Sequence, residues 1–209
     1  MKKITLLLAV MTVFTANIFA QETNQKFNLG IKAGGNFSNI YDTQGDSFTA
    51  DGKLGFAGGV FMSIPIIKFI GIQPEVLFSQ KGFKGKGVLL GSSYDLTRTT
   101  SYIDIPILLA IKPINMLTIL AGPQFSFLLK EKNVFQNSLA SVEQEEVFKN
   151  DNVRKNIMGF TGGLDLNFQS ITLGLRANYD YQTNNGDGTS STPRYKNAWY
   201  QATIGFRFL

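Results

Sequence analysis

Eight segments of the chain alternate apolar and polar residues with a period of two. The first of them, FNLGIKAGGNFS, has one oily side and one side that carries Lys32, two asparagines and a serine. Such alternation predicts β-strands with one apolar and one polar face. The eight predicted strands are 27–38, 54–64, 70–80, 101–111, 117–129, 156–168, 171–182 and 197–209. No segment shows a convincing helical period, so the sequence predicts an all-β domain.

The charged residues of these predicted strands all lie on one face. They are Lys32, Glu75, Asp104, Asp165, Arg176, Asp180 and Arg207. Because side chains alternate strictly between faces, blind placement of the charges would separate them this well roughly once in a hundred cases. A lysine or arginine that faces lipid at the membrane midplane destabilises a protein by about 2–4 kcal/mol. The pattern therefore predicts that hydrocarbon surrounds the apolar face and that the charges are enclosed.

The connections between the predicted strands alternate in length. Long polar stretches follow the first, third, fifth and seventh strands, whereas the tight turns PIIK, KPINM and QS follow the second, fourth and sixth. Long loops at one end, short turns at the other and an even strand number are typical of bacterial outer-membrane barrels. A bilayer core offers no partners to free backbone groups, so a sheet that crosses it must close. Residues 27–209 are thus predicted to form an eight-stranded antiparallel up-and-down transmembrane β-barrel.

A soluble, lipocalin-like barrel is the competing interpretation, because such barrels place the apolar face inward around a ligand. The opposite face of this chain, rich in glycine, threonine and asparagine with few charges, would coat a soluble protein poorly. Pro74, Pro106 and Pro123 lie inside predicted strands, where proline cannot donate to the ladder. We expect bulges or local register breaks at these three positions.

The N-terminus predicts export. Lys2 and Lys3 precede the apolar run ITLLLAVMTVFTANIFA, which ends at a small residue, as in a secretory signal peptide. We expect cleavage after Ala20, a short periplasmic arm over residues 21–26, and a location in the cell outer membrane. Loss of the two lysines lowers the net charge from +5 to +3 (5 − 2 = 3). This charge is too small to indicate nucleic-acid binding.

The interior of an eight-stranded barrel is narrow enough for side chains to fill it. Because buried charges must be paired, we expect the seven enclosed charges to form a salt-bridged interior that fixes strand register. A narrow proton or ion path through the same residues is the alternative. The chain contains no histidine and no cysteine, which excludes the usual zinc sites, Ser-His-Asp triads and cysteine nucleophiles. We expect no enzymatic activity, no metal and no cofactor.

The predicted loop that begins QKGFKGKG holds three lysines just above the expected outer interface. Phosphates of lipopolysaccharide could pair there with Lys81, Lys84 and Lys86. A merely solvated loop is the other interpretation. Long polar loops on a rigid scaffold are also where binding to other partners usually occurs.

Several sequence blocks, in their order along the chain, resemble the PorT-like outer-membrane β-barrel family of Bacteroidetes. They are GIKAGGNFS, GFAGGVFMSIP, IQPEVLFSQKG, YIDIPILLAIKP, LAGPQFSFLL, GFTGGLDL, LGLRANYDY and IGFRFL. The resemblance runs from about Phe27 to Leu209. It implies a barrel that the barrel-assembly machinery inserts after reading an aromatic C-terminal strand, here through Phe206 and Phe208.

The founding member of that family is linked to type IX secretion, but a shared fold does not transfer a function. Three functions therefore remain open. The first is a non-catalytic barrel that serves surface interaction or envelope structure and meets outer-membrane lipid and lipopolysaccharide. The second is an accessory of protein secretion, with secretion-system proteins as partners, and the third is a small channel.

Overall fold

The computed structural model describes residues 27–41, 50–89, 92–137, 141–146, 154–184 and 195–208. Nine strands lie within them: β1 (Asn28–Tyr41), β2 (Ala50–Ile67), β3 (Ile70–Leu89), β4 (Ser92–Ile114), β5 (Leu117–Asn137), β6 (Ser141–Glu146), β7 (Asn156–Phe168), β8 (Ile171–Asp180) and β9 (Lys196–Arg207). Within this part of the chain no helix is long and apolar enough to cross a membrane. The expected signal peptide and periplasmic arm lie outside the described residues.

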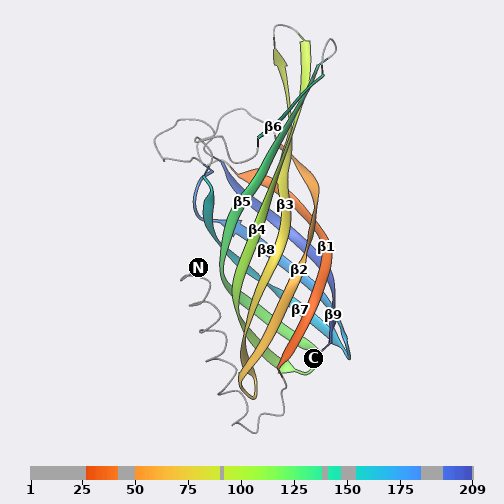
Figure 1. Ribbon diagram of the computed structural model, residues 1–209, viewed down its shortest axis with the longest axis vertical. Helices are drawn as coiled ribbons and strands as arrows, with labels where there is room; N and C mark the ends of the chain where they lie inside the picture. The colour runs from red at the N-terminus through yellow and green to blue at the C-terminus, as the bar shows by residue number, and fades with distance from the viewer. Residues whose placement is uncertain are drawn as a thin grey trace, which may run out of the picture.

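Eight of the strands close into a ring. The sheet runs in the order β4-β3-β2-β1-β9-β8-β7-β5, and β4 pairs with β5 to complete the circle. Every pairing is antiparallel, and Figure 1 shows the strands tilted around a common axis. The first and last strands meet in a continuous seam from Gly30↔Arg207 to Tyr41↔Lys196. The predicted eight-stranded antiparallel barrel is confirmed.

The apolar face of the barrel points outward. Ile31 is 52% exposed whereas its neighbour Lys32 is 7% exposed, and β8 alternates exposed and buried positions from Ile171 to Asn178. Exposed large apolar side chains occur on all eight barrel strands, while most of the buried side chains are polar or charged. A barrel that holds its oily side chains outside and its charges inside contradicts the lipocalin-like alternative.

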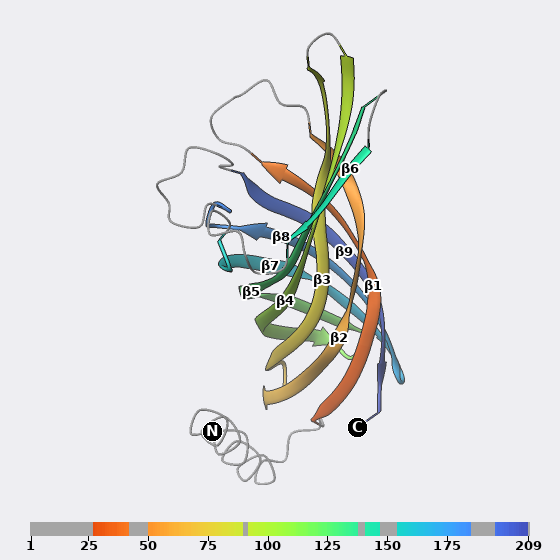
Figure 2. The same ribbon diagram turned by 45° about the horizontal axis from the view of Figure 1, so that its top comes forward.

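Two hairpins extend the sheet past the barrel wall at the loop end, as Figures 1 and 2 show. The stretch expected to be a loop after residue 80 continues β3 and β4, which pair without a shift from Lys81↔Thr100 to Leu89↔Ser92. The short strand β6 pairs with the end of β5. The sequence did not predict these extensions, because alternation of apolar and polar residues arises where one face of a strand meets an apolar environment and the other a polar one. Beyond the membrane the environments of the two faces differ less, so the alternation weakens.

The three strand prolines produce interruptions and no shifts in register. Pro123 pairs with Phe160 inside an unbroken β5–β7 ladder. The β4–β5 ladder skips the pairs between Pro106↔Gln124 and Leu109↔Ala121, then resumes in the same register. The sequence predicts bulges or local register breaks. No bulge or register shift lies at these positions, but the ladder is interrupted beside each of the three prolines, since proline has no N–H to donate. Register shifts occur elsewhere, at Gly52/Ala57, Pro65/Ile67, Ser101/Tyr102 and Ile111/Ile114.

Candidate functional site

The interior nearer the short turns contains a neutral cluster of two cations and two carboxylates. Lys32 of β1 forms a 2.7 Å ion pair with Glu75 of β3. Arg176 of β8 forms a 2.7 Å ion pair with Asp165 of β7, and its other terminal nitrogen lies 3.6 Å from Glu75. Gln73 links the pairs by donating to Glu75 at 2.9 Å and to Asp165 at 3.1 Å. All five side chains are buried, so each charge is matched where water is excluded.

Amide and hydroxyl side chains occupy the interior between the charged clusters. Asn36 donates to the Ser79 hydroxyl at 2.9 Å and accepts from Gln201 at 2.9 Å. The Thr161 hydroxyl lies 2.8 Å from the side-chain oxygens of Gln124 and Asn178. These contacts connect β1, β3 and β9 on one side and β5, β7 and β8 on the other. Such a satisfied polar network fixes the relative positions of the strands that supply it.

Lys81 of β3 lies in an aromatic and acidic enclosure in the half of the barrel toward the loops. Its ammonium group lies 3.0 Å from a carboxylate oxygen of Asp104 and 3.2 Å from the Ser126 hydroxyl. The same nitrogen lies 3.8 Å from the ring centroid of Trp199 and 4.6 Å from that of Tyr102. Lys81 is 0% exposed. An ion pair and two desolvated cation–π contacts therefore hold this cation inside the barrel.

Asp180 is a second carboxylate of this upper interior and is fully buried. Asn197 of β9 donates to its Oδ2 atom at 2.7 Å. Its Oδ1 atom has no hydrogen-bond partner among the described residues. Among the described residues, the upper interior thus holds two carboxylates, Asp104 and Asp180, beside the single cation of Lys81.

A third charged group closes the barrel at the rim toward the loops. Arg98 of β4 forms an ion pair with Glu131 of β5, which also accepts from Asn133 at 2.9 Å. The Tyr195 ring lies 5.4 Å from the Arg98 guanidinium and 5.4 Å from the Phe83 ring. Burial raises the pKa of the Tyr195 hydroxyl, so this group stays protonated at physiological pH.

Two further cations lie at the mouth formed by the short turns. Arg207 at the end of β9 donates to the backbone oxygen of Gln169 in the β7–β8 turn. Lys112 of β4 donates to the Ser63 hydroxyl at 3.2 Å. Both side chains are partly exposed, so this mouth is more open to solvent than the clusters above it.

The structure encloses six of the seven charged residues that the sequence assigned to the inner face. Arg207 points into the same end of the barrel but lies apart from the ion pairs, at the solvent-accessible mouth. Phe206 and Phe208, the expected assembly signal, are 51% and 50% exposed at the short-turn end of the outer wall.

The expected contact between Lys81 and lipopolysaccharide needs correction. Lys81 is sealed inside the barrel, whereas Lys84 and Lys86 are exposed on the β3 extension. The sequence could have shown that Lys81 faces inward, because it is the next alternate position after the inward residues Glu75, Leu77 and Ser79. Arg98 and Glu131 were missed for the same reason, since the predicted strand 101–111 begins after Arg98 and the predicted strand 117–129 ends before Glu131.

Within the described residues no group of histidine, cysteine, aspartate and glutamate side chains could hold a metal ion. Lysine or arginine neutralises Glu75, Asp165, Asp104 and Glu131. Paired carboxylates of this kind hold strands together and are not free to act as general acid and base.

A closed ring of eight antiparallel strands with an oily outer wall and a charged interior defines a small outer-membrane β-barrel. A family model described as "Outer membrane protein beta-barrel domain" matches residues 19–185. The chain belongs to this family and is a protein of the cell outer membrane.

Two solved structures of Ail show the same fold at low sequence identity. Ail, the attachment invasion locus protein of Yersinia pestis, aligns with a TM-score of 0.51 and 13% identity over 88% of this chain and 100% of Ail. Ail in complex with the heparin analogue sucrose octasulfate aligns with a TM-score of 0.50 and 12% identity, over the same shares of the two chains. Neisserial surface protein A aligns with a TM-score of 0.48 and 10% identity, over 88% of this chain and 100% of that protein. The search of the curated proteins gave no match.

Proposed function

We propose that this protein is a non-enzymatic outer-membrane barrel whose extended hairpins bind a partner outside the cell or brace the envelope. The observation that supports this role is the paired sheet above the barrel wall, formed by β3, β4, β5 and β6 (Figure 2). Ordering a residue of backbone costs about 1–2 kcal/mol, so a simple connection would be shorter and less regular. A rigid platform is useful where a surface must present a fixed shape.

The edge of this platform suits strand addition. In the described part of the chain β6 pairs with β5 on one side and with no strand on its other side. An unpaired edge offers backbone N–H and C=O groups to an extended segment of a partner. The β6 sequence SVEQEE carries three glutamates, so an extended segment with basic residues would match its charge. Lys84 and Lys86 remain the proposed contacts for lipopolysaccharide phosphates.

The order of sequence blocks supports a finer assignment to the PorT-like group, and with it the alternative of an accessory to protein secretion. Insertion by the barrel-assembly machinery through Phe206 and Phe208 is part of the same proposal. For a secretion accessory, the partner surface would include the short turns at 68–69, 115–116 and 169–170. The two roles therefore place partners at opposite ends of the barrel.

Site-specific photo-crosslinking in cells tests both roles. A photoreactive amino acid replaces Val88 at the tip of the β3–β4 hairpin, Asn115 in a short turn, or Phe127 on the lipid-facing wall as the control. We expect a macromolecular adduct from position 88 and none from position 127. Adducts only from position 115 would support the secretion role, and adducts from neither end would contradict both.

A truncated hairpin provides the matched loss of function. Residues 86–95 are removed and Gly85 is joined to Leu96, its paired neighbour, through a two-residue turn. The barrel strands below are unchanged, so we expect the variant to assemble. On a gel, its unboiled form should then migrate differently from its boiled form. Retained capture of the partner found at position 88 would contradict the proposed role of the hairpin.

A further inference from the structure

The outer wall carries a groove of about 800 Å³ across β7, β8, β9, β1 and β2. Its floor consists of small residues from four neighbouring strands: Gly162, Ala177, Ala202 and Gly35. Gly162 faces Ala177 and Ala202 faces Gly35, and the two pairs lie on a diagonal, because Ala177 also faces Tyr200 and Ala202 also faces Leu175. All four small residues line the same depression in the lipid-facing surface.

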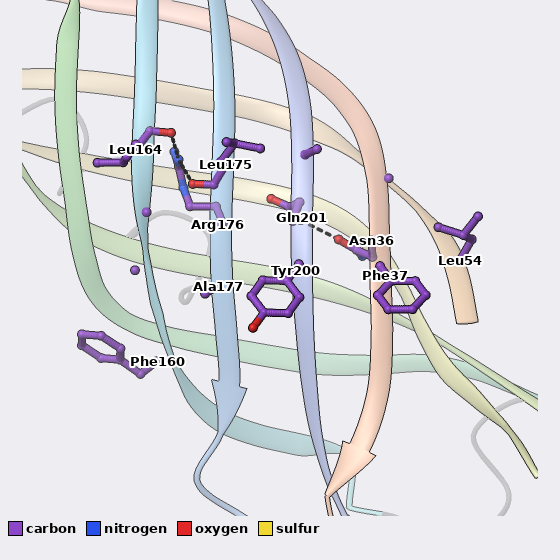
Figure 3. Close-up of a pocket in the computed structure, with 14 residues that line it drawn as sticks. Asn36, Phe37, Leu54, Phe160, Leu164, Leu175, Arg176, Ala177, Tyr200 and Gln201 are labelled. Carbon is purple, nitrogen blue, oxygen red and sulfur yellow. Dashed lines mark hydrogen bonds between the residues drawn. The ribbon is translucent and has the colours of Figure 1, made fainter. Parts of the chain in front are cut away.

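Large apolar side chains form the sides of the groove. They are Phe37, Leu54, Phe160, Leu164, Leu175 and Tyr200, and Figure 3 shows them around the strands that carry the floor. Leu54 and Tyr200 are 75% and 70% exposed, so they project as ridges on either side of Phe37. A groove bounded by branched and aromatic side chains fits a flexible hydrocarbon chain.

A cation lies above the groove on the side toward the loops. Lys196 faces outward from β9, two outward positions beyond Tyr200, which is about 13 Å along an extended strand. It faces Tyr41 of β1 in the seam, and its ammonium nitrogen lies 5.7 Å from the Tyr179 ring centroid. On β1, β7, β8 and β9 no other outward-facing residue is charged. Tyrosines around a lysine mark the interface between hydrocarbon and headgroups.

We infer that this groove binds an acyl chain of a lipopolysaccharide molecule, with a phosphate of its lipid A headgroup at Lys196. The groove supplies an apolar slot at membrane depth, and Lys196 supplies the one positive charge on the outward faces of the described strands β1, β7, β8 and β9. Outer-membrane barrels have short periplasmic turns and longer extracellular loops, which places the long-loop end at the outer leaflet, where lipopolysaccharide combines several acyl chains with phosphates. The inference rests on the outer-membrane location and is independent of the partner proposed for the hairpins.

Native mass spectrometry of the full chain in detergent micelles tests the inference. The added probes are hexa-acylated, diphosphorylated lipid A and, for comparison, phosphatidylglycerol. We expect retained lipid A adducts on the monomer at concentrations where phosphatidylglycerol gives few. Equal retention of the two lipids would overturn the assignment to lipopolysaccharide.

Filling the groove gives the decisive variant. Ala177→Phe places a large ring on the floor, and Val76→Phe places the same ring on β3, across the barrel from β8 in the ring order. We expect lipid A adducts to be lost for Ala177→Phe and retained for Val76→Phe. Gly162→Leu is a second filling variant, because a Cβ at Gly162 has no heavy atom nearer than 3.8 Å. Retained binding in assembled forms of both filling variants would contradict the proposed slot.

Removing the cation tests the headgroup contact. Lys196→Gln removes one lysine near the membrane surface. We expect the Kd for lipid A to rise roughly fivefold, which corresponds to about 1 kcal/mol of binding free energy. Lys68→Gln removes an exposed lysine from the turn between β2 and β3, at the opposite end of the barrel, and serves as the control. An equal effect of the two substitutions would show general charge attraction only. A dimer of the native chain that Ala177→Phe converts to monomer would show that a second copy occupies the groove, and would overturn the proposal.

Discussion

At the scale of single residues, Lys81 shows how burial changes the role of a charged side chain. Its sequence context, directly before glycines and further lysines, resembles a solvated loop, yet its ammonium group touches Asp104, Trp199 and Tyr102 inside the barrel. A lysine without these partners would not remain in an enclosed interior. The cost of separating it from Asp104 is correspondingly large.

Lys81→Met removes the cation and keeps the length of the side chain. Because Asp104 is then left buried without its partner, we expect a loss of about 3–5 kcal/mol in the free energy of unfolding. Urea unfolding followed by fluorescence measures it, since Trp199 is the one tryptophan of the chain. Lys84→Met, at an exposed position, should change stability by less than about 0.5 kcal/mol.

A double variant separates the ion pair from packing. Lys81→Met with Asp104→Leu removes both charges, and replacement of a buried pair by apolar residues is often neutral. We expect most of the lost stability to return. A double variant as unstable as Lys81→Met would show that the missing contact is with the aromatic rings and not with the carboxylate.

At the scale of elements, the seam between β1 and β9 decides whether the sheet closes. Gly34 and Gly35 are neighbours in β1, but they differ in the space around them. A Cβ on Gly34 would collide with the backbone oxygen of Ala202 in β9, whereas one on Gly35 would lie 3.5 Å from its nearest neighbour, the oxygen of Gly55. The close approach of the two strands at Gly34 therefore requires a residue without a side chain.

Gly34→Ala should weaken this seam, because the strands must separate to accommodate the methyl group. Overpacking of this kind typically costs about 1–3 kcal/mol. We expect a smaller fraction of folded barrel on an unboiled gel of outer-membrane fractions. Gly35→Ala is the matched control and should assemble as the native chain does. Equal assembly of the two variants would contradict the crowded geometry of the seam.

At the scale of the whole molecule, charged clusters and polar layers cross the interior one above another. The cluster around Glu75, the amides around Asn36 and the Lys81 enclosure each join side chains from different parts of the ring. The Arg98–Glu131 pair joins the neighbouring strands β4 and β5. Together these side chains fill the narrow lumen of an eight-stranded barrel. The whole ring is thereby held in one register.

A filled lumen predicts that ions do not pass at a measurable rate. We expect the purified barrel to give no steady current in planar lipid bilayers over the voltages at which porins conduct. A porin tested in the same bilayers confirms that insertion is detected. A reproducible single-channel current from this protein would favour the third function, a narrow channel, and would show that the ion pairs open.

The sequence by itself determined the number of strands in the barrel wall, the antiparallel ring and the face that meets lipid. These properties follow from local alternation, because every second residue of a strand faces the same side of the sheet. The sequence of each strand therefore shows which residues face lipid and which face the interior. The tertiary structure alone decided which charges meet. Lys32 pairs with Glu75 across 43 residues of sequence, and Gln201 donates to Asn36 across 165 residues. Neither contact follows from the period of a strand. The length of the hairpins and the groove beneath Lys196 likewise depend on register between strands, which is fixed only when the ring closes.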